Sequence, residues 1–301
     1  MITFFSTPKP FRGHIGIIQR NAIQSWKLVH PDAEVILFGN EEGAAEAAHE
    51  FGARHETEVD RNELGTPLLS SLFERASRLA RHDRLCFLNA DILLTDDFLA
   101  AATKLSQFHT RSLMVGRRCD VDITQPLDFS APDWGQRLRS IARESGKLRP
   151  PQWIDFFVFP RGLLQDQVPS FAVGRPGYDN WLLWKVRSMG VHVVDVTRVV
   201  LAIHQNHDYS HHPGGQTGLW KDVEARQNYA LLGKGHFATI DNATHLLTPY
   251  GLRTNYYHWI ARAKRKASDA RNAAWFGLLD LTRPLRRRLG QRQRHSPEPP
   301  R

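Results

Sequence analysis

Residues 85–94 read LCFLNADILL, an apolar run that is interrupted near its end by Asn89 and Asp91. Such a run, with helical patterns before and after it, predicts a buried strand of a parallel sheet that helices cover on both faces. Open sheets of this kind bind ligands at the carboxyl ends of their strands, so Asp91 is expected at a functional edge. A plain turn at Asn89 and Asp91, followed by a helix that residues 95–97 (TDD) cap, is the alternative.

The segments around this strand alternate between strand and helix patterns. Residues 2–6 (ITFFS) and 33–39 (AEVILFG) have the composition of strands, whereas residues 15–29 and 41–51 have helical patterns. This order predicts an α/β fold with one mostly parallel central sheet flanked by helices.

The segment FLNADI, residues 87–92, resembles the DxD region of GT-A glycosyltransferases, which transfer a sugar from a nucleoside diphosphate donor. The resemblance implies a GT-A-like domain in which Asp91 binds the donor diphosphate through Mn²⁺ or Mg²⁺. Asn89 stands at the first acidic position, and an amide is a weaker ligand for a hard cation than a carboxylate. Its implied role is to assist at the ribose or at the metal.

In the same family, the loop after the first strand and the helix before the acidic motif contact the nucleotide. Ser6 and Thr7 fall in that loop, and Thr66 precedes Pro67 at the predicted start of a helix. The resemblance therefore assigns Ser6, Thr7 and Thr66 to donor binding. Turn and capping chemistry is the alternative for each of them.

Two further acids are candidates for catalysis. Asp179 follows the turn GRPG at residues 174–177 and is expected in the first turn of a helix, where the helix dipole stabilises its ionised form. This position resembles that of the GT-A acid that faces the acceptor and acts as the base, with N-capping as the alternative. Asp155 interrupts the apolar run 153–160 (WIDFFVFP). Because an unpaired buried charge is very costly, Asp155 is expected to be a site residue or a hydrogen-bonded structural residue.

Four histidines lie in residues 204–212 (HQNHDYSHH), with a spacing unlike that of a zinc finger or a His-Glu-x-x-His site. Many GT-A enzymes use a late histidine as a further ligand to the metal. The resemblance therefore assigns His204 to the metal, with His207 as the other candidate and a structural histidine as the alternative.

This 301-residue chain has a net charge of +9, and its C-terminal residues 259–301 carry it. Residues 259–301 hold 12 of the 40 basic and 3 of the 31 acidic side chains, which leaves 28 of each before them. We therefore predict a GT-A-like domain over residues 1–258 and a basic amphipathic, partly disordered tail over residues 259–301. Aromatic and basic clusters that alternate in the tail are typical of a helix at an anionic membrane surface, and a solvated tail is the alternative. No recognised nucleic-acid-binding module surrounds these charges.

The N-terminus lacks the pattern of a signal peptide, and the apolar runs are shorter than the roughly 20 residues that span a bilayer. With two cysteines, Cys86 and Cys119, the chain is expected to be a cytoplasmic protein with reduced thiols. Attachment of the tail to the inner face of the cell membrane remains open.

The resemblance to GT-A enzymes implies a glycosyltransferase that moves a sugar from a nucleotide sugar to a glycan or glycolipid, by inverting displacement if one carboxylate acts only as a base. A non-catalytic, membrane-docked nucleotide-sugar-binding protein is one alternative. A sugar-nucleotide pyrophosphorylase is another, although such enzymes normally have a Gly-rich phosphate loop, which residues 7–10 (TPKP) do not provide.

Overall fold

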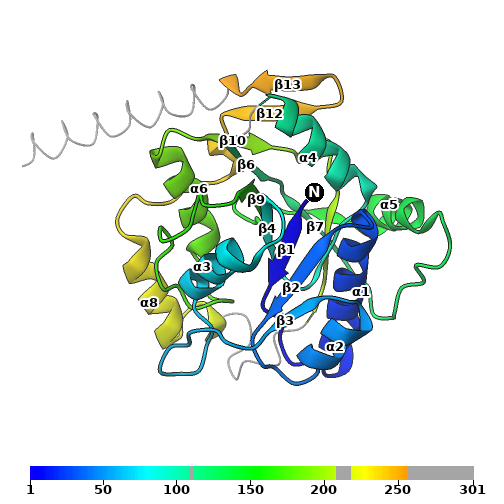
Figure 1. Cartoon of the computed structure of the whole chain (residues 1–301). Helices are drawn as coiled ribbons and strands as arrows, with labels where there is room; N and C mark the ends of the chain where they lie inside the picture. Colours follow the sequence, from blue (N-terminus) through cyan, green and yellow to red (C-terminus); the bar gives the residue numbers. More distant parts are fainter. Residues whose placement is uncertain (109–110, 208–217, 257–301) are drawn as a thin grey trace, which may run out of the picture. The chain divides into compact units, whose positions relative to one another are not determined.

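The computed structural model describes residues 1–108, 111–207 and 218–256 (Figure 1). The chain divides into two units, Met1–Asn255 and Tyr256–Arg301, and the helices and strands named here belong to the first. The predicted tail, residues 259–301, lies outside the described residues.

Nine strands form the main sheet of the first unit. They are β1 (Thr3–Ser6), β2 (Glu34–Phe38), β3 (Arg54–Glu56), β4 (Arg84–Leu88), β6 (Ser112–Val115), β9 (Phe156–Pro160), β10 (His192–Asp195), β12 (His245–Thr248) and β13 (Gly251–Thr254). Their order across the sheet is β13-β12-β10-β6-β9-β4-β1-β2-β3. Among these strands, β9 and β13 run antiparallel to their neighbours and every other pairing is parallel. The predicted α/β fold with a mostly parallel central sheet is confirmed.

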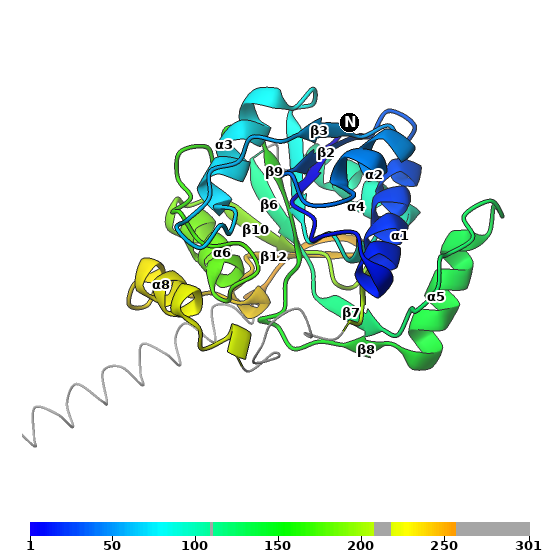
Figure 2. The same cartoon turned by 90° about the horizontal axis from the view of Figure 1, so that it is seen from below.

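Helices cover both faces of this sheet. The helices of this unit are α1 (Gly13–Val29), α2 (Ala44–Glu50), α3 (Leu69–Leu79), α4 (Asp96–Phe108), α5 (Trp134–Ser145), α6 (Tyr178–Ser188), α8 (Val223–Leu232) and the 3₁₀ turn η1 (Ile240–Asn242). Of these, α5 packs against residues 118–121, outside this sheet. Figure 2 shows α3 and α6 on one side of the sheet and α1 and α2 on the other. Two separate apolar clusters fill these two layers.

Strand β4 lies inside the sheet and contributes to both clusters. Leu85 and Phe87 pack in the cluster that contains α3 and α6, whereas Cys86 and Leu88 pack in the cluster that contains α1 and α4. This alternation is the period of a strand buried on both faces. One expectation is wrong, because β4 is parallel only to β1 and its other neighbour, β9, is antiparallel.

The strand also ends earlier than its apolar run. After Leu88 the chain turns at Asn89, whose backbone N–H donates to the Asp155 carbonyl and whose carbonyl accepts from Ile92. Residues Ile92–Leu93 form β5 in a second sheet, with β7 (Arg118–Val121), β8 (Lys147–Leu148) and β11 (Ala202–Gln205), in the order β5-β11-β7-β8. The turn therefore moves the chain from one sheet to the other.

Helix α3 begins at Leu69, so the prediction that Thr66-Pro67 opens a helix is wrong. Pro67 and Leu68 instead form isolated bridges to Arg61 and Ala172, which keeps the segment extended.

Cys86 and Cys119 are both free and buried, as expected for reduced thiols. No helix among the described residues combines the length and the apolarity that crossing a bilayer requires.

Candidate functional site

A cavity of about 560 Å³ opens where β1 and β4 end. Its walls come from the loop after β1, the turn after β4, the start of α6 and the end of β11. All the residues that sequence analysis assigned to the site line it: Ser6, Thr7, Thr66, Asn89, Asp91, Asp155, Asp179 and His204. The structure thus brings the predicted residues together, and their chemical roles remain predictions.

Asp91 is held in the turn between β4 and β5. Its backbone carbonyl accepts hydrogen bonds from the Gln205 backbone N–H and from the Gln205 side chain, both at 3.2 Å. Its carboxylate is nearly buried, with a side-chain exposure of 15%. Oδ1 is buried and has no hydrogen-bond partner among the described residues, so it is available to a ligand.

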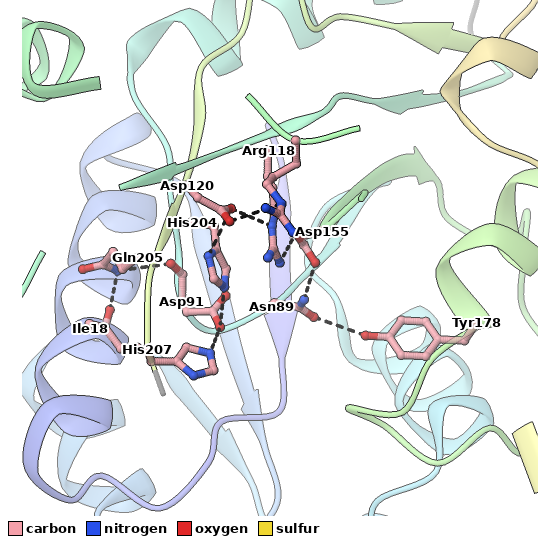
Figure 3. A network of polar contacts seen from close by, with 11 residues as sticks. Ile18, Asn89, Asp91, Arg118, Asp120, Asp155, Tyr178, His204, Gln205 and His207 are labelled. Carbon is pink, nitrogen blue, oxygen red and sulfur yellow. Dashed lines mark hydrogen bonds and ion pairs between the residues drawn. The ribbon is translucent and has the colours of Figure 1, made fainter. Parts of the chain in front are cut away.

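Two imidazoles face the other oxygen of this carboxylate (Figure 3). Nε2 of His204 is 3.6 Å and Nε2 of His207 is 3.3 Å from Asp91 Oδ2. Burial alone would raise the pKa of Asp91, but His204, His207 and Lys9 outweigh it and lower the pKa. Asp91 is therefore ionised at neutral pH.

The donor set of Asp91, His204 and His207 fits a divalent metal ion. One ligand atom from each residue lies within 4.8 Å of the other two, and the described residues contain no other such group of three. Two imidazole nitrogens suit first-row transition ions, whereas Mg²⁺ prefers oxygen ligands. Of the two predicted metals, the residues present favour Mn²⁺ over Mg²⁺.

A chain of buried charged groups continues from His204. Asp120 Oδ1 lies 3.3 Å from His204 Nδ1 and 2.8 Å from Arg118 Nε, and Arg118 Nη1 lies 2.9 Å from Asp155 Oδ2 (Figure 3). Burial alone would lower the pKa of Arg118, but the negative charges of Asp155 and Asp120 outweigh burial and raise the pKa above its usual value. The guanidinium stays charged and joins the two carboxylates.

Asn89 continues this network toward α6. Its Nδ2 donates to Asp155 Oδ1 at 2.7 Å, and its Oδ1 accepts from the Tyr178 hydroxyl at 3.3 Å. Burial raises the pKa of Tyr178, so the hydroxyl remains a proton donor. Both ends of the Asn89 amide thus bind protein groups, which differs from the predicted assistance at the ribose or the metal.

Asp155 lies just before β9 and is 9% exposed. Both of its carboxylate oxygens are engaged, one by Arg118 and one by Asn89. Of the two interpretations of this acid, these contacts favour the structural one.

Asp179 lies in the first turn of α6, as predicted. The helix start was expected to stabilise its ionised form, but its pKa is raised instead. Gly177 occupies the N-cap position in the left-handed conformation that glycine adopts easily, and Asp179 Oδ1 accepts from the next backbone N–H, that of Asn180, at 2.9 Å. Burial first, and then the charge of Asp155, raise the pKa of Asp179 to about 7. Desolvation therefore outweighs the helix dipole, and the pKa lies where a general base is most effective.

The three residues assigned to the donor differ in what their side chains do. The Ser6 hydroxyl donates to the Leu88 carbonyl at 2.7 Å, which joins the ends of β1 and β4. Thr7 Oγ1 is buried without a hydrogen-bond partner among the described residues. Thr66 lines the cavity, and its backbone N–H donates to Asn62. Of the three hydroxyls, that of Thr7 is the one most clearly available to a ligand.

Sequence reasoning missed Arg118, Asp120, Tyr178 and Lys9. Arg118 and Asp120 alternate along β7 and so lie on one face of the second sheet, a signal that was available in the sequence. Lys9, in the loop after β1, lines the cavity, and burial lowers its pKa although Asp91 opposes this shift.

No protein-family model and no curated protein matches this chain. Solved structures with a similar fold include glucosyl-3-phosphoglycerate synthase from Mycobacterium tuberculosis, at 17% identity over 84% of this chain and 86% of that one, with a TM-score of 0.47. The same enzyme in complex with Mg²⁺ and UDP matches at 17% identity over 77% and 78%, with a TM-score of 0.46. The mannosyltransferase PcManGT from Pyrobaculum calidifontis, in complex with GDP-Man and Mn²⁺, matches at 18% identity over 67% of this chain and 56% of that one, with a TM-score of 0.42.

Proposed function

We propose that this protein transfers a sugar from a nucleoside-diphosphate sugar to a glycan or glycolipid acceptor and uses a divalent cation to do so. One observation carries the proposal: a single cavity holds a cation-ligand set and a carboxyl group whose pKa is about 7. The first suits binding of a diphosphate, and the second suits deprotonation of a hydroxyl.

Asp91, His204 and His207 would hold the cation beside the donor diphosphate. When bound, the cation would supply positive charge against the negative charge that develops on the departing nucleoside diphosphate. Because this set has one carboxylate rather than two, less of the cation's charge is neutralised by the protein. More of it remains for the diphosphate.

Lys9 would supply a second positive charge to the donor. Its backbone N–H donates to Gln19 Oε1 at 2.6 Å and its carbonyl accepts from Gln19 Nε2 at 2.8 Å, which fixes the loop against α1. Its ammonium group has no hydrogen bond or ion pair within the described part of the chain. A diphosphate entering the cavity would give this partly desolvated ammonium group a partner of opposite charge.

Asp179 would take the proton from the acceptor hydroxyl. Asp155, the other acid considered for this role, is committed to Arg118 and Asn89. If Asp179 acts only as a base and no other carboxylate forms a covalent intermediate, the displacement would be direct and would invert the anomeric configuration.

Aromatic side chains at the edge of the cavity would bind the acceptor. Trp220, Tyr229 and Phe237 line the cavity and remain 42%, 46% and 47% exposed. Phe237 precedes Ala238, which exchanges two hydrogen bonds with Asn180, the neighbour of Asp179. Flat apolar faces near the proposed base suit a sugar ring or the apolar part of a glycolipid, and large exposed apolar groups of this kind mark binding sites.

The basic tail, which lies outside the described residues, would attach the protein to an anionic membrane surface from the cytoplasmic side. The charge count of residues 259–301 supports this part of the proposal. A membrane-bound acceptor would then be close to the cavity.

Binding and turnover together test the function. A thermal-shift screen of nucleoside diphosphates should give stabilisation that depends on Mn²⁺, because a ligand that binds only the folded state raises its stability. The matching nucleotide sugars should then release nucleoside diphosphate, faster with acceptor than without. Binding without release would indicate a non-catalytic binder, and formation of pyrophosphate from a nucleoside triphosphate and a sugar phosphate would indicate a pyrophosphorylase.

A further inference from the structure

Asp120 faces the side of His204 that points away from Asp91. Strands β7 and β11 are parallel, and Asp120 and His204 are direct partners in their register, so their side chains project from the same face. Nδ1 of His204 lies 3.3 Å from Asp120 Oδ1, while its Nε2 lies 3.6 Å from Asp91 Oδ2 (Figure 3). The imidazole therefore spans two carboxylates, one on each ring nitrogen.

The ring nitrogen that carries the proton decides whether His204 can bind a cation. A histidine ligand must be neutral, and it binds through the nitrogen that lacks a proton. An ionised carboxylate accepts hydrogen bonds and cannot donate them, so Asp120, at 3.3 Å, stabilises a proton on Nδ1 more than Asp91, at 3.6 Å, stabilises one on Nε2. His204 Nδ1 is buried and makes no hydrogen bond of regular geometry in the described part of the chain, and Asp120, at 3.3 Å, is its ion-pair partner.

We propose that Asp120 is a positioning residue that keeps His204 protonated on Nδ1, so that Nε2 presents its lone pair beside Asp91 and His207 for a divalent cation. The inference rests on the cation site of the proposed function and does not depend on sugar transfer. It goes further by naming the side chain that makes His204 competent as a ligand.

The surroundings of Asp120 hold its carboxylate in one place. Arg118 Nε and Arg149 Nε lie 2.8 and 3.4 Å from its two oxygens, and the side chain is 11% exposed. Trp153 packs against both guanidinium groups, at 4.6 Å from Arg118 and 4.4 Å from Arg149.

The expected size of the effect follows from other metal sites. Removing the group that hydrogen-bonds the second nitrogen of a histidine ligand typically weakens metal affinity by about 10–100-fold. Asp120→Ala should therefore lose affinity for Mn²⁺ within this range. Asp120→Asn can still accept a hydrogen bond through its carbonyl oxygen and should lose less.

Two measurements that need no sugar donor test this. The first measurement determines the tautomer of His204 in the metal-free protein by ¹⁵N NMR of the imidazoles. Because the chain has 15 histidines, the signals of His204 are assigned by comparison with the His204→Gln variant. The second is Mn²⁺ affinity by calorimetry, with the metal alone. Asp83→Asn, which removes an exposed acid elsewhere, is the charge control and should leave both unchanged.

In the wild-type protein, we expect His204 to be protonated on Nδ1. In the Asp120→Ala variant, we expect the proton to shift toward Nε2 and Mn²⁺ to bind more weakly. A folded Asp120→Ala with the wild-type tautomer and affinity would overturn the proposal. If that variant does not fold, Asp120→Asn decides: a loss of affinity smaller than twofold overturns it. Altered Mn²⁺ binding in a protein that never transfers sugar would contradict the proposed function and leave this inference intact.

Discussion

Asn89 and Asp155 are joined by a hydrogen bond of 2.7 Å from the Asn89 amide to one carboxylate oxygen, and both side chains lie on the wall of the cavity. The other end of the same amide accepts from Tyr178. An ionised aspartate at position 89 could not donate to Asp155. The residue that departs from the acidic motif is therefore the one that this network requires.

Asn89→Asp, which restores an acid at the first motif position, should destabilise the protein without strengthening Mn²⁺ binding. It replaces a hydrogen bond with two facing carboxylates in a mostly buried place, and losing one partner of a buried polar pair costs about 1–3 kcal/mol. Urea unfolding at neutral pH should rank the stability as wild type, then Asn89→Ala, then Asn89→Asp. Tighter Mn²⁺ binding with wild-type stability would show that Asn89 is a substituted metal ligand.

The sequence predicted the α/β fold because its strongest signals are local. The runs at residues 2–6, 33–39 and 85–88 are almost wholly apolar, and each becomes a strand buried on both faces. The antiparallel insertion of β9 between β4 and β6 was not predictable in this way. A strand buried on both faces has the same apolar pattern in either direction, and its direction depends on how the chain crosses the sheet.

For the site, the sequence predicted which residues gather but not what each side chain contacts. Asp91 and His204 are separated by a long stretch of chain, and their proximity depends on the antiparallel pairing of β11 with β5. The raised pKa of Asp179 depends on burial that only the packed walls of the cavity provide. Asn89 looked like a weakened ligand because its partners, Asp155 and Tyr178, are distant in sequence.

Removing the carboxylate of the metal site should abolish binding of the cation. Asp91→Asn keeps the size of the side chain but loses the charge that pairs with a divalent ion, so Mn²⁺ should no longer raise the melting temperature in the presence of a nucleoside diphosphate. In the wild type, Mn²⁺ should bind more tightly than Mg²⁺ because two of the ligands are imidazoles. Equal stabilisation of Asp91→Asn and wild type by Mn²⁺ would remove Asp91 from the site.

Lys9→Gln should weaken binding of a nucleoside diphosphate by about tenfold or more, since a charge-assisted hydrogen bond is worth about 1.5–3 kcal/mol. Binding of the corresponding nucleoside, which has no phosphate, should not change. Lys104→Gln, on α4 and outside the lining of the cavity, is the matched control and should bind both ligands as the wild type does. Calorimetry with both ligands measures the difference, and an equal loss for the two would contradict a phosphate contact.

A protein that ends at residue 258 should remain folded and lose its affinity for anionic vesicles. Each basic side chain near such a surface contributes about 1 kcal/mol, so binding of the full chain should also weaken as salt is added. Co-sedimentation with vesicles of anionic and of neutral lipid makes the comparison. Equal sedimentation of the full and shortened chains would show that the tail is not the membrane contact.

The raised pKa of Asp179 predicts how stability changes with pH. In the unfolded chain this carboxyl ionises near pH 4, whereas in the folded protein its pKa is about 7. The folded state therefore binds the proton more tightly, and the resulting stabilisation is lost as the pH rises from about 4 to about 7. The Asp179→Asn variant has no proton to lose at this position, so it should avoid this loss.

Asp179→Asn should separate catalysis from folding. Sugar transfer should fall by about 10²–10⁴-fold, because the amide cannot accept the proton of the acceptor hydroxyl, while the affinity for nucleoside diphosphate stays the same. In the wild type the rate should rise with pH and level off above about pH 7, where Asp179 is ionised. Relative to the wild type, the variant should be more stable at pH 8 than at pH 5 by about 1–3 kcal/mol, which urea unfolding at the two pH values measures. Near-normal transfer by the variant would mean that another group is the base.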